Sequence, residues 1–151
     1  MTIESRLKEL GITLPEPSTA VANYLPVIEE DGWITVSGQL PMRDGQLTCT
    51  GYVGGDVTPE DAYQAARLCA INGLALIKQA AGSLDNVRII RVGGFVASAK
   101  GFTGQPKVIN GASDLLVEVL GDRGRHARAA VGVAELPLGA AVEVELQARI
   151  L

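Results

Sequence analysis

The stretch TPEDAYQAARLCAINGLALIKQAAG (residues 58–82) constrains the fold more than any other part of the chain. Thr58 is a favourable N-cap residue, Pro59 suits the first helical position, and Gly82 supplies a helix stop. Apolar residues recur between them at helical spacing, and most of these are small: Ala62, Ala66, Cys69, Gly73, Leu76, Ile77 and Ala80. The pattern therefore predicts a long helix that lies unusually close to the layer it covers.

The rest of the chain predicts a sheet around this helix and one further long helix. Residues 32–41 alternate as a strand does, and the turn residues RDGQ connect them to residues 47–54, which we interpret as the hairpin partner. The proline-punctuated segment 12–26 is interpreted as irregular. The full predicted order is a short helix (4–11), two strands (32–41, 47–54), the long helix (58–82), a strand (88–98), a second helix that begins near Pro106 (107–121) and two strands (127–134, 141–150).

This order predicts the α+β class, with a mixed sheet that carries both long helices packed on one face and a short N-terminal helix in addition. A length of 151 residues is typical of one domain, in which we interpret residues 1–20 as an N-terminal helical extension. No secretory signal pattern opens the sequence, and no apolar run is long enough to cross a membrane. We therefore expect a cytoplasmic protein without a membrane partner.

Composition narrows the possible partners. A net charge of −4 and an aromatic content of 4% argue against nucleic acid, which needs a basic face or a stacking platform. Cys49 and Cys69 lack metal-ligand spacing and are interpreted as buried thiols in a reducing compartment. The sequence contains no metal-binding or phosphate-cradling motif, so we expect neither a metal nor an organic cofactor.

The segment GRHARAAVGVAELP (124–137) places a basic cluster at the start of a strand of small and apolar residues. Strand periodicity puts Arg128, Ala130 and Gly132 on one face and the valines on the other, which we expect to lie against the core. An arginine beside such small residues has room to bind a ligand, and its planar fork matches a carboxylate.

The last strand divides in the same way, with valines on one face and Glu143 and Glu145 on the other. If the two final strands pair through the LPLGA turn, these carboxylates come within reach of Arg128. Spacing alone favours a different interpretation, an exposed hairpin held by surface ion pairs, and a lone loop histidine such as His126 is commonly incidental.

These segments carry a resemblance to a known family. ARAAVGVAELP followed by VEVE resembles the C-terminal signature of the Rid (YjgF) family, the reactive-intermediate imine deaminases, also described as L-PSP endoribonuclease-like proteins. Upstream, YLPVIEEDGWITVSGQLP is similar to the tyrosine-containing loop and SGQ strand of that family. The resemblance covers roughly residues 20–151, with the N-terminal helix and the GRHAR segment typical of a longer, divergent branch.

The resemblance implies a chorismate-mutase-like fold, a homotrimer with clefts between subunits, and a set of site residues. Arg128 matches the arginine that holds the substrate carboxylate, and Glu143 matches the glutamate that positions water. Tyr24, Ser37 and Asn110 match residues that line the cleft, and Ala130 replaces a frequent cysteine. Tyr24 and Arg128 are then expected to come from different chains.

Hydrolysis of a 2-imino or enamine acid to a 2-oxo acid and ammonia requires little besides these groups. The protein holds the carboxylate, orients a water molecule and accepts a proton from it. A trimeric module that binds small carboxylates without turnover is the alternative that the same arginine serves. Endoribonuclease activity is a weaker alternative, because the chain is acidic and poor in aromatic residues.

Overall fold

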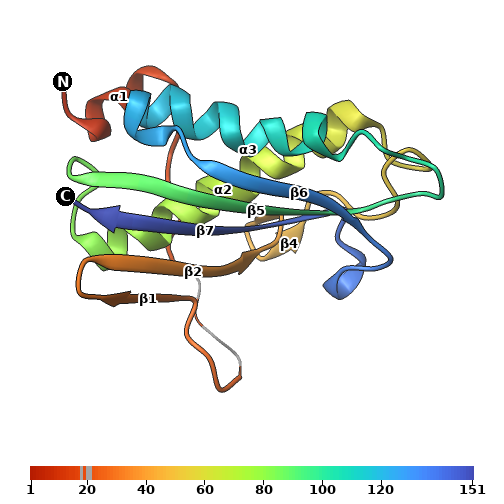
Figure 1. Ribbon diagram of the computed structural model, residues 1–151, viewed down its shortest axis with the longest axis horizontal. Coiled ribbons are helices and arrows are strands. Elements are labelled where there is room, and N and C mark those ends of the chain that lie inside the picture. Colours follow the sequence, from red (N-terminus) through yellow and green to blue (C-terminus); the bar gives the residue numbers. More distant parts are fainter. Residues whose placement is uncertain (18, 20–21) are drawn as a thin grey trace.

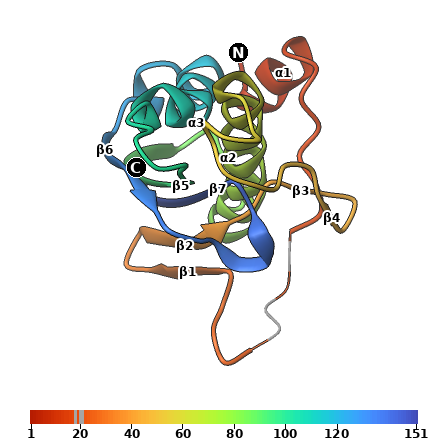
Figure 2. The same cartoon turned by 90° about the vertical axis from the view of Figure 1, so that its right-hand side faces the viewer.

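The computed structural model describes residues 1–17, 19 and 22–151 of the chain, which form a helical layer on one face of a twisted sheet (Figures 1 and 2). The helices are α1 (Ile3–Glu9), α2 (Pro59–Ala81) and α3 (Gln105–Leu120), with two 3-10 turns at η1 (Gly121–Gly124) and η2 (Pro137–Gly139). The strands are β1 (Val27–Glu30), β2 (Trp33–Gln39), β3 (Met42–Arg43), β4 (Gln46–Leu47), β5 (Val87–Ala97), β6 (Ala127–Val133) and β7 (Val142–Ile150). The predicted α+β class and both long helices are confirmed.

The five main strands lie in the order β1-β2-β7-β5-β6. β5 is antiparallel to β7 and parallel to β6, and the other neighbouring strands are antiparallel. The sheet is therefore mixed, as predicted. Buried side chains of β2, β5 and β7 face the helices, among them Ile34, Val92 and Leu146. The opposite face carries no helix (Figure 2).

The prediction of the first hairpin is wrong in its pairing. Residues 47–54 do not form a second strand beside β2: only Gln46–Leu47 pairs, with Met42–Arg43, and the remainder is a loop with isolated bridges. The hairpin partner of β2 is instead β1, a strand that the sequence analysis did not predict. Asp31 and Gly32 form its two-residue turn, both with positive φ (52° and 81°), as a tight hairpin requires.

The predicted C-terminal hairpin is also wrong, although both of its strands exist. β6 and β7 each pair with β5 and not with each other, so β5 lies between Arg128 and the glutamates of β7. The face assignment in β6 changes with it. Arg128 lies beside the buried Val92, on the helix side of the sheet, whereas Val131 is 45% exposed on the open face.

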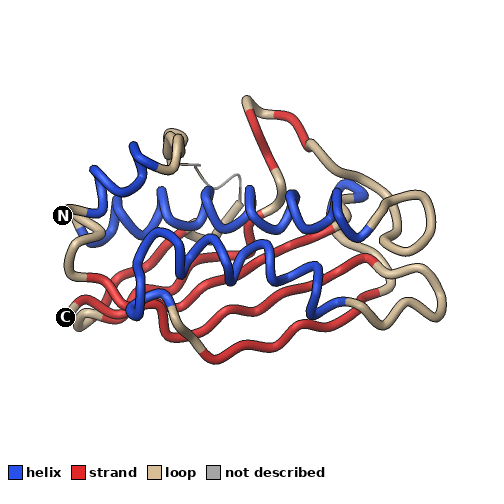
Figure 3. The backbone as a smooth tube through the Cα atoms, turned by 90° about the horizontal axis from the view of Figure 1, so that it is seen from above, coloured by secondary structure: helices blue, strands red, loops and turns tan. Residues whose placement is uncertain are grey.

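Small residues bring the helices close to the sheet and to each other, as the stripe in α2 predicts. A Cβ atom at Gly73 of α2 would lie 2.5 Å from Leu146 of β7. A Cβ atom at Gly111 of α3 would lie 2.0 Å from the Tyr63 carbonyl oxygen of α2. Figure 3 shows the two helices side by side over the strands. Larger residues at these positions would force the layers apart.

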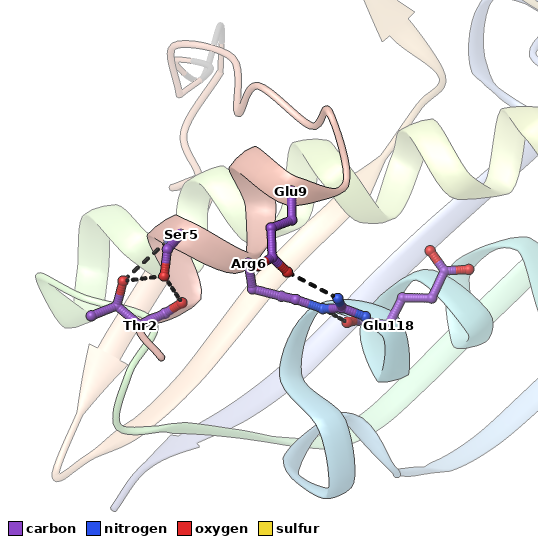
Figure 4. Close-up of polar contacts among 5 residues, drawn as sticks. All are labelled: Thr2, Ser5, Arg6, Glu9 and Glu118. Atoms are coloured by element: carbon purple, nitrogen blue, oxygen red, sulfur yellow. Dashed lines mark hydrogen bonds and ion pairs between the residues drawn. The ribbon is translucent and has the colours of Figure 1, made fainter.

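The N-terminal helix α1 docks on the ends of the two long helices. Thr2 caps it by accepting the Ser5 backbone N–H at 3.1 Å, and the Ile3 N–H donates to the Asp85 carboxylate at 2.8 Å. Arg6 Nε donates to the Glu118 carbonyl at 2.9 Å, which ties α1 to α3 (Figure 4). Leu7, 3% exposed, joins the main core. The extension is thus part of the packed structure.

Replacing Leu7 with alanine tests this docking. We expect Leu7→Ala to lower the free energy of unfolding by about 2–4 kcal/mol, because it removes a buried leucine and leaves a cavity beneath α1. Lys8→Ala, on the exposed side of the same helix, is the matched control and should change stability by less than about 0.5 kcal/mol. Urea denaturation measures both values. Equal stability of the two variants would show that α1 does not contribute to the core.

Candidate functional site

Arg128 lies on the edge strand β6 and reaches across to α3. Its Nη1 donates to Asn110 Oδ1 at 2.8 Å and to Ser113 Oγ at 3.1 Å, and its Nη2 donates to the Pro106 carbonyl at 3.2 Å. The three acceptors follow one another at i, i+4 and i+7 and therefore share one face of α3. The helix holds the guanidinium in a defined orientation, and the predicted proximity of Asn110 to Arg128 is present.

These contacts leave one edge of the guanidinium available. Arginine has five N–H donors, and three of the Arg128 donors have acceptors. Within the described part of the chain, the Nε–H and one Nη2–H have no acceptor. In a guanidinium the Nε–H and one Nη2–H point side by side, and this pair of donors suits both oxygens of a carboxylate. Arg128 is thus oriented by α3 and still able to bind an anion.

His126 and Ser113 extend the Arg128 network toward the 3-10 turn η1. His126 Nε2 lies 2.8 Å from Ser113 Oγ, and its Nδ1 lies 2.6 Å from the Gly124 carbonyl oxygen. Burial lowers the pKa of His126 from its usual 6.5, and the charge of Arg128 lowers it further, while the bond to Gly124 acts in the opposite direction. The imidazole is therefore held neutral near pH 7.

Glu143 lies on the open face of the sheet, over Gly38 of β2. A Cβ atom at Gly38 would lie 2.2 Å from Glu143 Oε1, so the glycine provides the space that the carboxylate occupies. Burial raises the pKa of Glu143, and the neighbouring Glu145 raises it further. The carboxylate is consequently a stronger proton acceptor than an exposed glutamate.

Ser37, which precedes Gly38 in β2, bonds the loop that contains Tyr24. Ser37 Oγ donates to the Leu25 carbonyl at 2.7 Å, and the Ser37 N–H donates to the Pro26 carbonyl at 2.9 Å. Both bonds fix the loop that carries Tyr24, whose side chain is 55% exposed. Ser37 therefore anchors the tyrosine loop, and its hydroxyl proton is engaged there.

The predicted residues thus fall into two groups within one chain. Arg128, Asn110 and Ala130 lie on the helix side of β6, with Ala130 packed against the core. Tyr24 lies in the loop before β1, Ser37 in β2 and Glu143 on the open face of β7. The expectation that Glu143 or Glu145 reaches Arg128 through a shared hairpin is wrong, because β5 separates the strands. Glu145 instead lies 3.8 Å from Arg91 of β5.

Sequence reasoning missed two contributors to these groups. Ser113 was not singled out, although it lies three residues after Asn110 and so on the same helical face. Gly38 was noted only as part of the SGQ motif, yet it makes room for Glu143. His126 was noted, but its partner on α3 is distant in sequence and had no local signal.

Two open cavities of about 640 and 730 Å³ lie away from both groups. The first is lined by the start of α2 and the loop before it, and the second by α1 and the segment that follows. No predicted site residue lines either of them in the part of the chain that the structure describes. In residues 1–17, 19 and 22–151, no cluster of three metal-ligating side chains occurs, and no helix is long and apolar enough to cross a membrane.

Comparison with known proteins agrees with this fold and these motifs. Residues 4–150 match the family model described as "YjgF/chorismate mutase-like, putative endoribonuclease". A Trypanosoma cruzi protein named Protein TCP17 is 43% identical over 145 residues, which cover 95% of this chain and 91% of that protein. The chain therefore belongs to the YjgF (Rid) family.

Two solved structures are similar over nearly the whole chain. One is a protein of unknown function from Agrobacterium tumefaciens, with 51% identity and a TM-score of 0.91, covering 99% of this chain and 92% of that one. The other, from Shewanella oneidensis, is described as a "putative endoribonuclease". It has 37% identity and a TM-score of 0.95, and the match covers 99% of this chain and 100% of that one. The chorismate-mutase-like fold that the resemblance implied is confirmed.

Gly38→Ala tests the placement of Glu143. The added methyl group occupies the position of the Glu143 carboxylate, which must move toward solvent, so we expect the raised pKa of Glu143 to fall toward 4.5. Stability should change by less than about 1.5 kcal/mol, because the end of a flexible side chain yields easily. A carboxyl-carbon NMR titration measures the pKa. Glu145→Gln is the reference variant, because it removes the charge of Glu145 and leaves the burial that also raises the pKa of Glu143. An unchanged Glu143 pKa in Gly38→Ala would contradict the placement.

Proposed function

We propose that this protein hydrolyses reactive 2-imino or enamine acids to 2-oxo acids and ammonia. The observation that carries the proposal is the Arg128 guanidinium, fixed by Asn110 and Ser113 with its Nε and Nη2 edge available. That edge suits the carboxylate common to such substrates. Membership in the Rid family supports the same reaction class.

The reaction needs few protein groups. Arg128 holds the carboxylate and so fixes the adjacent C=N carbon. A water oxygen bonds to that carbon of the N-protonated imine as the C=N π pair moves to nitrogen, while Glu143 accepts a proton from the water. Glu143 returns this proton to the nitrogen of the resulting carbinolamine. The hydroxyl group then gives its proton to Glu143 and becomes the C=O group as the C–N bond breaks, so ammonia leaves and the 2-oxo acid remains. The raised pKa of Glu143 favours this role as proton acceptor.

We further propose that each site forms between two copies of the chain in a homotrimer. Arg128 lies on the helix side of β6, whereas Glu143 lies on the open face, and β5 runs between their strands. One small substrate that contacts both groups therefore needs them from different chains. The open face offers an apolar surface for a second copy, since Trp33 is 48% and Val131 45% exposed. Tyr24 then comes from the same chain as Glu143.

A carboxylate-binding module without turnover is the second candidate. It is favoured by the separation of Arg128 from Glu143 within one chain, since binding alone requires only the arginine. Endoribonuclease activity, which the family description includes, fits less well with a net charge of −4. Release of ammonia from freshly generated 2-iminobutyrate separates catalysis from binding: a rate equal to the reaction without protein would contradict the deaminase proposal.

Arg128 variants test the carboxylate contact. Because a charge-assisted hydrogen bond contributes about 1.5–3 kcal/mol, Arg128→Ala should lower kcat/KM by about 10- to 150-fold. Arg128→Lys should restore only part of the activity, since it keeps the charge and loses the fork. Arg125→Ala is the control, because the Arg125 side chain is 74% exposed and pairs with Asp122 of the neighbouring turn η1. If Arg125→Ala is the damaging change, the carboxylate site is elsewhere.

Mixed oligomers test the shared site. Glu143→Gln should keep the affinity for a 2-oxo acid and lower kcat, because the amide keeps the shape and loses the base. When Glu143→Gln and Arg128→Ala chains are unfolded together and refolded, about a quarter of randomly mixed intersubunit sites regain both groups. Activity of the mixture should therefore exceed that of either variant alone.

The controls for this experiment use the same chains. The two variants refolded separately and then combined should show no more activity than they do alone if exchange is slow, and light scattering should report a trimeric mass for every sample. A monomeric mass at micromolar concentration contradicts the oligomer. Trimers without any regain of activity contradict the division of the site between chains.

A further inference from the structure

A chain of hydrogen bonds links the Gly124 carbonyl to Arg128 through His126 and Ser113. We propose that His126 and Ser113 are positioning residues for carboxylate binding: neutral His126 accepts a hydrogen bond from the Ser113 hydroxyl group, which turns a Ser113 lone pair toward Arg128. The proposal rests on the proposed function, because it takes Arg128 as the group that receives the carboxylate. It assigns a role to the one histidine of the sequence.

The direction of each bond follows from the atoms involved. A carbonyl oxygen can only accept, so the 2.6 Å contact to Gly124 places the proton on His126 Nδ1. Nε2 of the neutral ring is then an acceptor, and the Ser113 hydroxyl must donate across the 2.8 Å contact. A guanidinium can only donate, so Ser113 Oγ accepts from Arg128 Nη1 at 3.1 Å. Each of the three hydrogen bonds in this chain therefore joins one donor to one acceptor.

Without His126 the Ser113 hydroxyl group has no fixed hydrogen-bond acceptor, so its orientation is no longer defined. A helical serine can turn its hydroxyl to the carbonyl four residues earlier, here that of Ile109. Ser113 then adopts several rotamers, and only Asn110 and the longer Pro106 contact orient Arg128. The carboxylate edge is consequently less well aligned, which weakens binding without changing the chemistry at the reacting carbon.

Arg128 is the charged group that acts on His126 most directly. On α3, Asp114 bonds Tyr63 and Glu118 pairs with Arg67, so both face α2. In η1 and its flank, Arg123 donates to the Asp85 carbonyl, and Asp122 and Arg125 form an exposed pair. On β5, Arg91 pairs with Glu145 on the open face of the sheet.

Ligand binding and His126 protonation are therefore linked. In the free protein burial lowers the pKa of His126, and the charge of Arg128 lowers it further. A protonated His126 donates from both ring nitrogens, so it cannot accept from Ser113 and no longer turns the Ser113 lone pair toward Arg128. Affinity for the carboxylate therefore falls as the pH drops through the pKa of His126, and by the same linkage bound ligand lowers that pKa. A histidine unconnected to the site would show no such dependence.

NMR of the single imidazole tests the linkage directly, because no second histidine overlaps its signals. At pH 7 the ring nitrogens should show the neutral Nδ1–H tautomer. Addition of 2-oxobutyrate, which stays ionised throughout the titration, should lower the pKa of His126. Arg128→Ala should raise this pKa without ligand and abolish the ligand effect. Arg125→Ala should leave both titrations close to those of the parent.

A double-mutant cycle tests the positioning role. Ser113→Ala and His126→Leu should each weaken 2-oxobutyrate binding by about 3- to 10-fold, and the double variant should bind no worse than either single one. The kcat for 2-iminobutyrate at saturation should change by less than about 2-fold. His126→Gln should retain most of the affinity, since its amide oxygen can accept from Ser113, and should lose the pH dependence.

The outcomes separate this proposal from the proposed function. If Arg128→Ala abolishes binding while Ser113→Ala and His126→Leu bind like the parent, the positioning role is wrong and carboxylate binding by Arg128 stands. If the pKa of His126 ignores both ligand and Arg128→Ala, the linkage is wrong. If 2-oxobutyrate binds equally to the parent and Arg128→Ala, or to neither, the assignment of Arg128 fails and this proposal fails with it.

Discussion

Strand β5 pairs in parallel with β6 and antiparallel with β7, and the placement of every candidate group depends on this arrangement. Because β5 fills the space between the last two strands, the chain must cross the sheet from β6 to β7 by way of η2. The crossing puts Arg128 at the edge beside α3 and Glu143 two strands away on the open face. These central strands also place large apolar residues under the helices, among them Ile89 of β5 and Leu146 of β7.

Close packing of α3 against the sheet positions Arg128 of the edge strand. Gly94 of β5 admits Ile109, since a Cβ atom there would lie 2.5 Å from that side chain. The next residue, Asn110, then lies at the right depth to accept from Arg128. A Cβ atom at Gly132 of β6 would lie 2.8 Å from Gln105 Nε2 and 2.9 Å from Ser98 Oγ, so the backbone is similarly close to its neighbours here. The small residues of β6 thus allow α3 to pack closely against the strand. Arg128 is the long side chain on that face of β6.

The sequence predicted the local elements well and their partners poorly. α2 and α3 were readable because caps, prolines and helical periodicity are properties of neighbouring residues. The β1–β2 hairpin also had a local signal, the Asp31-Gly32 dipeptide between alternating residues, which was overlooked. The pairing of β6 with β5 had none, since parallel strands join residues more than thirty positions apart and side-chain periodicity does not identify the partner.

The same division holds for the site. By itself the sequence determined the helices and the segments that form β2, β5, β6 and β7. It also gave the alternation of side chains along these strands and the resemblance that singled out Arg128, Asn110 and Glu143. Only the tertiary structure decided which face meets the helices, because an alternating strand of alanine, glycine and valine has no strongly polar side to define it. It also decided that His126 meets Ser113 and that Glu143 lies over Gly38. Those contacts join distant segments, and packing of the whole chain is what brings them together.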